Sequence, residues 1–306
     1  MRKLEGVVVA HTTPFGNDGK LDHKVLEQQV DFLASNGVHG IFACGTTAEA
    51  QILTAEERKE VLQSIIDINK GRMVIVAQCG TTNLADTKDL IDHARTVGCD
   101  GVAVVTPYYY VYSQDELLDY YSTLAQECDE NFPLYLYNIP SLAKNNLDVS
   151  TVRTLSEAYP QIAGIKDSSG DMTTFSGYIL ETPAEFRVLV GCDRGFLSVL
   201  LLGGHGSVTG PGGIFPEPFV NVWNAFQQGN FDEARREQKK LIAISAAMGE
   251  GADFAMLKAA LSLRGIGNGL MRPPFKSLVK DAVTTLKTRL EKALEHTGYT
   301  LKGYIA

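Results

Sequence analysis

MVIVAQC at residues 73–79 and GVAVVT at residues 101–106 flank the amphipathic stretch LADTKDLIDHARTVG at residues 84–98. Both apolar runs are continuous rather than alternating, as expected for parallel strands that are buried on both faces. Gly98 ends the amphipathic stretch at a position where a helix commonly finishes in a left-handed residue. Residues 73–106 therefore predict a strand, a helix and a second strand parallel to the first.

The same unit recurs along most of the chain. Two of the intervening helices are predicted to begin with a capping box, formed by Thr54 with Glu57 and by Ser113 with Glu116. Strands are predicted at Gly6–Thr12, His39–Cys44, Met73–Cys79, Gly101–Thr106, Pro133–Ile139, Ile162–Lys166, Phe186–Val190 and Gly206–Thr209.

About eight strand–helix repeats are typical of a closed parallel barrel. An open doubly wound sheet alternates in the same way, but it usually has fewer strands and often a glycine-rich phosphate loop after the first one. Here the first run leads into His11-Thr-Thr-Pro-Phe15, which has no such glycines. The predicted fold class is therefore α/β, a (β/α)8 TIM barrel.

The strand signal stops near Phe215, and three or four helical stretches follow it. No Ser-, Pro- or Gly-rich linker separates these stretches from the preceding repeats. We therefore expect residues 1–224 to form the catalytic barrel, and residues 225–306 to form an all-helical C-terminal extension packed on it.

Composition narrows the classes of function. The 28 Lys and Arg residues against 36 Asp and Glu residues give a net charge of −8 without any basic cluster, which argues against nucleic acid as a partner. No run approaches the roughly 18 apolar residues of a membrane span, and we expect no membrane partner. The five scattered cysteines are odd in number and have no CxxC spacing. They fit reduced thiols in a cytoplasmic protein.

In a parallel barrel, the active site lies at the carboxyl ends of the strands. Lys166 follows Ile162-Ala-Gly-Ile165 directly, so its amine is expected at the mouth of an apolar strand bundle. A desolvated amine is more readily neutral and can attack a carbonyl carbon. From Lys166 alone, a lysine paired with a neighbouring carboxylate explains the position equally well.

Three hydroxyl-bearing residues are expected on the same rim. Tyr137 lies on the strand before that of Lys166, where a phenol can relay a proton, although a core tyrosine is the commoner explanation. Thr46 and Thr47 precede a helix and can bind a carboxylate, although ordinary capping explains either one alone. Taken together, a lysine, a tyrosine and two threonines are what imine chemistry on a 2-keto acid requires.

No cofactor or metal ion is predicted. The six histidines do not cluster with carboxylates at metal-ligand spacing, so a metal-dependent aldolase is disfavoured. Neither GxGxxG nor GxxxxGK[ST] occurs, so nucleotide binding has no support.

The chain resembles the dihydrodipicolinate synthase / N-acetylneuraminate lyase family of class I pyruvate-dependent aldolases. The likeness covers nearly the whole length and lies in five motifs in family order. These are TPF at Thr13–Phe15, GTTAE at Gly45–Glu49, TPYY at Thr106–Tyr109, YNIP at Tyr137–Pro140 and GIKDSSGD at Gly164–Asp171.

The resemblance implies a role for each matching residue. Lys166 would form the Schiff base, Tyr137 would relay protons, and Thr46 and Thr47 would bind the carboxylate of pyruvate. Tyr109 resembles the tyrosine that reaches into a neighbouring subunit's site, and the family's usual assembly implies a homotetramer, a dimer of dimers. Further substrate-binding residues are expected after the seventh strand and in the eighth, at Gly191, Asp193, Arg194 and Val208.

Departures from the family pattern bear on the substrate. The synthases have an arginine two residues after the proline of YNxP, where this chain has Leu142. An apolar side chain cannot replace a bidentate carboxylate ligand, which counts against aspartate semialdehyde. Ala48 replaces the commoner glycine of GTTGE. Arg194 breaks the acidic pair of the sialic acid lyases, while Asp193 can still accept from a polyol hydroxyl.

The favoured function is therefore a lyase that reversibly cleaves a 2-keto-3-deoxy sugar acid, or a similar 4-hydroxy-2-keto acid, to pyruvate and an aldehyde. Two alternatives use the same imine: dihydrodipicolinate synthase and a keto-deoxy sugar acid dehydratase. A non-enzymatic sugar-acid binding protein is the alternative from another class, and the retention of both Lys166 and Tyr137 argues against it.

Overall fold

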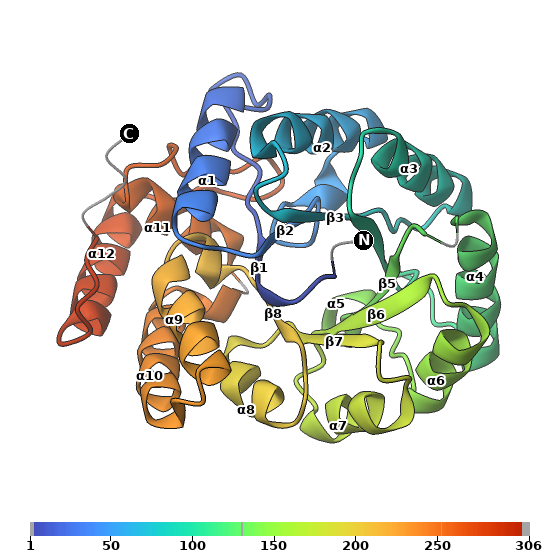
Figure 1. Cartoon of the computed structure of the whole chain (residues 1–306). Helices are drawn as coiled ribbons and strands as arrows, with labels where there is room; N and C mark the ends of the chain where they lie inside the picture. Colours follow the sequence, from blue (N-terminus) through green and yellow to red (C-terminus); the bar gives the residue numbers. More distant parts are fainter. Residues whose placement is uncertain (1–2, 130, 252, 302–306) are drawn as a thin grey trace. The chain divides into compact units, whose positions relative to one another are not determined.

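The computed structural model describes residues 3–129, 131–251 and 253–301. Eight strands follow one another in chain order around a closed barrel (Figure 1), and β1 pairs with β2, and each strand from β3 to β7 with the next, in parallel. This confirms the predicted fold class. The strands are β1 (Gly6–Ala10), β2 (Gly40–Ala43), β3 (Val74–Gln78), β4 (Gly101–Val105), β5 (Leu134–Asn138), β6 (Ile162–Asp167), β7 (Arg187–Val190) and β8 (Gly206–Thr209).

The chain divides into two compact units, and each is described by itself. The first unit comprises Met1–Gly6 and Val74–Val208, and it holds β3 to β7 with most of β8. Its strands β4 and β5 are buried along their whole length, as the continuous apolar runs predict. Its helices are α3 (Leu84–Thr96), α4 (Gln114–Glu127), α5 (Pro140–Ala143), α6 (Val149–Ala158), α7 (Met172–Glu181) and α8 (Phe196–Leu201), with a 3₁₀ turn η2 (Asp193–Gly195).

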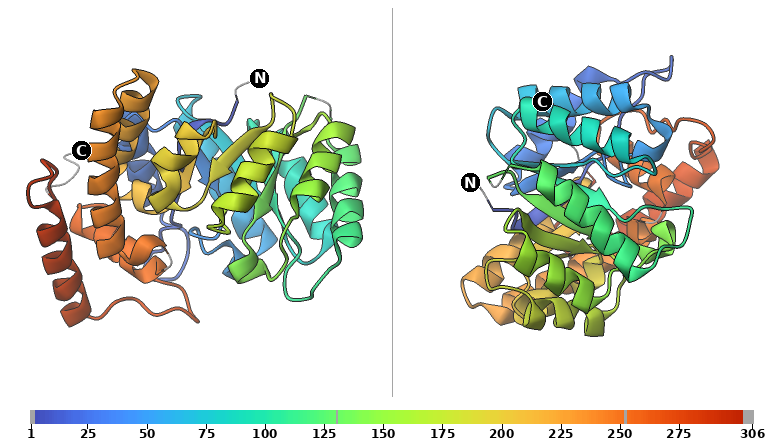
Figure 2. Two further views of the ribbon diagram at one scale, coloured as in Figure 1. Left: turned by 90° about the horizontal axis from the view of Figure 1, so that it is seen from below. Right: turned by 90° about the vertical axis from the view of Figure 1, so that its right-hand side faces the viewer.

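The second unit comprises Val7–Met73 and Thr209–Ala306. Within it, α10 packs against both α9 and α12, which Figure 2 shows running alongside one another. Its helices are α1 (His23–Ser35), α2 (Ala55–Asn69), α9 (Pro216–Gln227), α10 (Phe231–Ala247), α11 (Phe254–Leu263) and α12 (Lys280–Leu294), and its 3₁₀ turns are η1 (Ala50–Ile52), η3 (Pro211–Gly213) and η4 (Gly249–Gly251).

Both predicted capping boxes are present. The Thr54 hydroxyl accepts from the backbone N–H of Glu57, and the Glu57 carboxylate accepts from the backbone of Thr54 at the start of α2. Ser113 and Glu116 make the same reciprocal pair at the start of α4. The expected boundary between residues 224 and 225 falls within α9, so the division into a barrel and a helical extension stays a prediction.

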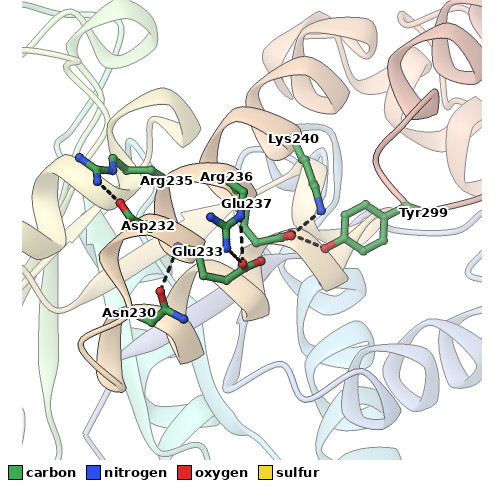
Figure 3. Close-up of polar contacts among 8 residues, drawn as sticks. All are labelled: Asn230, Asp232, Glu233, Arg235, Arg236, Glu237, Lys240 and Tyr299. Atoms are coloured by element: carbon green, nitrogen blue, oxygen red, sulfur yellow. Dashed lines mark hydrogen bonds and ion pairs between the residues drawn. The ribbon is translucent and has the colours of Figure 1, made fainter.

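The segment after α12 is tied to α10 by a buried carboxylate (Figure 3). Glu237 accepts a hydrogen bond from the hydroxyl of Tyr299, and its other oxygen lies 2.6 Å from Nζ of Lys240. Asn221 of α9 donates to the same hydroxyl at 2.8 Å. Burial raises the pKa of the Tyr299 phenol, and its hydrogen bond to Glu237 adds to that effect. These contacts join α9, α10 and the segment after α12 through one polar cluster around the buried Glu237.

No helix in the described ranges is long and apolar enough to cross a membrane.

His11 directly follows β1 and is a buried imidazole in the second unit. Burial lowers its pKa to about 4, whereas an unfolded chain has the ordinary value of about 6.5. Below pH 6.5 the unfolded chain therefore binds a proton that the folded chain does not bind. We expect His11 to cost about 2 kcal/mol of stability between pH 7.5 and pH 5.0.

Urea unfolding of the protein and of a His11→Gln variant at these two pH values measures this effect. Because glutamine does not titrate, the variant should lose about 2 kcal/mol less stability on acidification. An equal loss in both proteins would mean that folding does not shift the pKa of His11, so that the folded and unfolded chains take up its proton over the same pH range.

Candidate active site

The register between β5 and β6 sets Tyr137 beside Lys166. Leu134 pairs with Ile162, but the register then shifts by one residue, so that Tyr135 pairs with Gly164 and Tyr137 with Lys166. Without the shift at Ala163, the partner of Tyr137 would be the apolar Ile165. Because side chains alternate along a strand, this irregularity decides which β6 side chain meets Tyr137. Irregularities of this kind often re-aim a side chain beside an active site.

Gly164 is required for this register. A Cβ atom at Gly164 would lie 2.3 Å from the carbonyl oxygen of Arg187 on β7 and 2.9 Å from the ring of Tyr135 on β5. Any side chain there would push β6 away from one of its neighbours. The packing of the barrel therefore requires a glycine two residues before Lys166.

Lys166 and Tyr137 are both buried and in contact. Nζ of Lys166 lies 3.9 Å from the centre of the Tyr137 ring, and the exposed fractions of the two residues are 5% and 1%. The amine therefore lies against an aromatic face and away from water. The structure therefore brings together the two residues at the centre of the predicted chemistry.

A network of polar side chains connects the ends of β5 and β6. It includes Asn138 and Asp167, which directly follow Tyr137 and Lys166. Asn138 donates to the Asp167 carboxylate at 2.8 Å, and its side-chain oxygen accepts from the backbone N–H of Leu147 at 3.2 Å. The hydroxyl of Ser169 donates to the other Asp167 oxygen at 2.7 Å. Burial raises the pKa of Asp167, and these hydrogen bonds oppose that rise. Neither residue was predicted as part of the site from the sequence, although Asn138 lies in the YNIP motif and Asp167 in the GIKDSSGD motif.

The loop that carries Tyr109 is held by the buried side chain of Asn145. Its amide nitrogen donates to the carbonyls of Pro107 and Tyr110, each at 2.7 Å, and its oxygen accepts from the N–H of Tyr112 at 2.8 Å. Tyr109 has a left-handed backbone, with φ of 81°, and is 77% exposed. Residues other than glycine with a left-handed backbone often occur in functional loops. Asn145 is a further residue that was not predicted from the sequence, because no motif includes it.

The remaining predicted residues of the first unit lie after β7 and in β8. The N–H of Gly191 donates to the carbonyl of Asp167 at 2.7 Å and so continues the β6–β7 pairing. Asp193 is buried and Arg194 is exposed, both in η2. Val208 is buried within β8. Gly191 thus directly follows β7, Asp193 and Arg194 lie in the next turn, and Val208 lies in β8.

Thr46 and Thr47 lie in the second unit, in a loop that follows β2. Positive φ values occur on both sides of them, at Cys44 (53°) and Glu49 (58°). Left-handed residues other than glycine cost roughly 1 to 3 kcal/mol each and persist only where the surroundings enforce them. The Thr13 hydroxyl donates to the carbonyl of Ala48 at 2.7 Å inside the loop. The loop therefore contains two unfavourable backbone conformations, and Thr13, which lies outside the loop, holds it by a hydrogen bond.

Glu49 at the end of this loop forms a buried ion pair with Lys258 of α11. Nζ of Lys258 lies 2.5 Å from Oε1 of Glu49, and the two side chains are 5% and 0% exposed. Burial raises the pKa of the Glu49 carboxyl and lowers that of the Lys258 amine, and in each case the attraction of the partner opposes the shift. This ion pair was not predicted from the sequence, because Glu49 and Lys258 are far apart in the chain.

The described residues hold no group of three or more His, Cys, Asp or Glu side chains that could bind a metal ion.

Comparison with known proteins supports the family resemblance. The model of the dihydrodipicolinate synthetase family matches residues 3–293. The chain belongs to this family. A DapA-like lyase of Pyrococcus horikoshii is 36% identical over 280 residues, which are 89% of this chain and 94% of the relative. The 4-hydroxy-tetrahydrodipicolinate synthase of Methanopyrus kandleri is 32% identical over 293 residues, covering 95% and 96% of the two chains.

Among solved structures of the dihydrodipicolinate synthase family, YagE is similar over most of its length. This prophage protein from Escherichia coli K12 was crystallised in complex with pyruvate. It matches with a TM-score of 0.89 and 30% identity over 94% of this chain and 98% of its own. The members of this family are pyruvate-dependent class I lyases, and the prediction of an enzyme of the aldolase and lyase type is confirmed.

Proposed function

We propose that this enzyme reversibly cleaves a 2-keto-3-deoxy sugar acid, or a similar 4-hydroxy-2-keto acid, through a Schiff base on Lys166. The buried contact between Lys166 and Tyr137 carries the proposal, since it gives an amine nucleophile a neighbouring proton relay. The pyruvate complex of YagE supports pyruvate as the three-carbon product.

The proposed reaction begins when the Lys166 amine attacks the keto carbon of the substrate and water leaves to give a protonated imine. The Tyr137 hydroxyl acts as a proton relay: it takes the proton of the C4 hydroxyl while it gives up its own, and the released proton is the one that C3 later receives. The C3–C4 bond then breaks, the aldehyde departs, and the bonding electrons pass into the imine to form an enamine. Protonation at C3 and hydrolysis release pyruvate and restore the amine. Thr46 and Thr47 bind the carboxylate throughout.

Leu142 favours a sugar acid over aspartate semialdehyde. It lies in α5, directly after β5, and is 60% exposed, so an apolar side chain occupies the place of the synthases' arginine. Asp193 and Arg194, after β7, are proposed to contact the distal part of the substrate, with Gly191 and Val208 completing the substrate-binding residues. The second candidate is 4-hydroxy-tetrahydrodipicolinate synthase, which the Methanopyrus relative favours. It requires another basic group in place of the arginine.

We also propose a homotetramer in which Tyr109 enters the site of a neighbouring subunit. Tyr109, Tyr110 and Val111 form an exposed apolar loop, and Leu180 of α7 with Leu201 of α8 are further exposed apolar side chains in the same unit. The run of three exposed apolar side chains at Tyr109–Val111 supports a protein interface at this loop. A cytoplasmic location is proposed because the five cysteines are odd in number, scattered along the chain and without CxxC spacing.

Pyruvate release, coupled to lactate dehydrogenase, tests the proposed reaction. The substrates are 2-keto-3-deoxygluconate, 2-keto-3-deoxygalactonate, N-acetylneuraminate and 4-hydroxy-2-oxoglutarate. We expect at least one 2-keto-3-deoxy sugar acid to release pyruvate in the protein and not in a Lys166→Ala variant. Substrate consumption without pyruvate release would identify a dehydratase. Activity only with pyruvate and aspartate semialdehyde, in the direction of condensation, would identify the synthase.

A further inference from the structure

Glu49 stands two residues after the pair of threonines that the proposed function assigns to the substrate carboxylate. Its backbone N–H donates to the carbonyl of Thr46 at 3.0 Å, which closes the loop into one turn. Its φ of 58° is unfavourable for a residue with a side chain. The position of Thr47 therefore depends on whatever keeps Glu49 in this conformation.

Lys258 is the charged side chain paired with the Glu49 carboxylate, which also accepts a hydrogen bond from the backbone of Arg272. Its amine lies 2.5 Å from Glu49, donates to the carbonyl of Leu270 at 3.0 Å, and sits 4.1 Å from the centre of the Phe15 ring. These contacts come from three separate segments of the second unit, so the amine has little freedom to move. A charge fixed in this way is a rigid anchor for the loop.

We propose that the Glu49–Lys258 ion pair is a positioning element that holds Thr46 and Thr47 in the geometry that binds the carboxylate of a 2-keto acid. This inference rests on the proposed function. Without the pair, the backbone at Glu49 relaxes from its left-handed conformation, and the threonines move with it. Lys258 acts through Glu49 and has no contact of its own with the reacting atoms.

Stability alone is a weak explanation for the pair. Removing two charges from water costs much of what their attraction returns, and apolar residues of the same volume often serve as well. The strained loop that ends at Glu49 explains why an ion pair is present instead of an apolar pair. A short polar contact fixes the direction of the Glu49 side chain and with it the backbone turn, and an apolar pair makes no such directional contact. Positioning and stability can therefore be separated experimentally.

Borohydride trapping on the intact protein distinguishes a positioning role of the ion pair from a purely stabilising one. Wild type, Glu49→Gln and the double variant Glu49→Gln/Lys258→Met are incubated with rising pyruvate, and in parallel with acetone, a ketone that lacks the carboxylate. Glu217→Gln is the matched control, because it breaks another ion pair of the same unit, in which Glu217 meets Arg264 at 2.8 Å. Circular dichroism and the unfolding midpoint of each variant are recorded in the assay buffer.

In Glu49→Gln we expect half-saturating pyruvate to rise roughly 10- to 100-fold, as for a binding group displaced by about 1 Å, with acetone trapping unchanged. The double variant leaves no unpaired buried charge, so its unfolding midpoint should return toward the wild-type value while half-saturating pyruvate stays raised. Glu217→Gln should trap both ketones as wild type does.

Four results would overturn the inference. Glu49→Gln with wild-type half-saturation by pyruvate would leave the proposed function intact and remove the positioning role. Equal weakening for pyruvate and acetone, or recovery of pyruvate binding in the double variant, would reduce the pair to a structural one. A wild-type protein that pyruvate and borohydride do not label would contradict the proposed function itself, and the inference with it.

Discussion

Lys166→Ala is expected to abolish covalent trapping of pyruvate and to lower pyruvate release by roughly 10³-fold or more, because the alanine variant has no nucleophile for the imine. The lysine is buried against Tyr137, with Nζ 3.9 Å from the ring centre, and nothing else in β6 bears an amine. Intact mass spectrometry after borohydride treatment measures the loss, since the wild-type protein should gain the mass of one reduced pyruvate per chain.

Two further substitutions identify what the lysine supplies. Lys166→Arg keeps a positive charge but cannot form an imine, so it should be as inactive as Lys166→Ala. Lys144→Met removes an exposed lysine of the same unit and should leave trapping and pyruvate release at wild-type levels. If Lys166→Arg kept substantial activity, the residue would act through its charge rather than as a nucleophile.

Peptide mapping of the labelled protein makes the test sharper. Lys258 is also 5% exposed, so burial alone does not distinguish the two lysines. The Lys258 amine, however, is paired with Glu49 at 2.5 Å and donates to the carbonyl of Leu270. The reduced pyruvate should therefore map to the peptide that contains Lys166. A label on Lys258 would contradict the proposed mechanism.

The strands could be predicted closely because their physics is local. A parallel strand that is buried on both faces needs a continuous apolar run, and each predicted run overlaps an observed strand with ends that differ by at most two residues. The two capping boxes are local for the same reason, since each joins residues three positions apart. Such features need no knowledge of the rest of the chain.

The contacts that set the site depend on distant residues and could not be predicted. The placement of Tyr137 beside Lys166 was expected from neighbouring strands, but the register shift at Ala163 that produces it is a property of three strands packed together. Asn145 holds the Tyr109 loop from more than thirty residues away. No periodicity or short motif records interactions of this kind.

Tyr137→Phe is expected to lower kcat for pyruvate release by about 10²- to 10⁴-fold, the usual effect of removing a proton relay. Phenylalanine keeps the ring that lies 3.9 Å from the Lys166 amine, so the packing of the site should survive and only the hydroxyl is lost. Steady-state kinetics with the best substrate of the keto-acid panel measures the effect. Tyr121→Phe is the matched control, because it removes a buried hydroxyl of the same unit that donates to the carbonyl of Val104 at 3.0 Å.

The control variant should lose stability but keep its kcat, because the Tyr121 hydroxyl bonds to the backbone of β4. Comparing trapping with turnover then locates the step that the Tyr137 hydroxyl serves. If Tyr137→Phe forms the pyruvate adduct at the wild-type rate but cleaves substrate slowly, the hydroxyl takes the proton of the C4 hydroxyl as the C3–C4 bond breaks. If both rates fall together, the hydroxyl also carries protons during imine formation. Wild-type rates in both assays would exclude Tyr137 as the relay and leave its ring as a packing partner of Lys166.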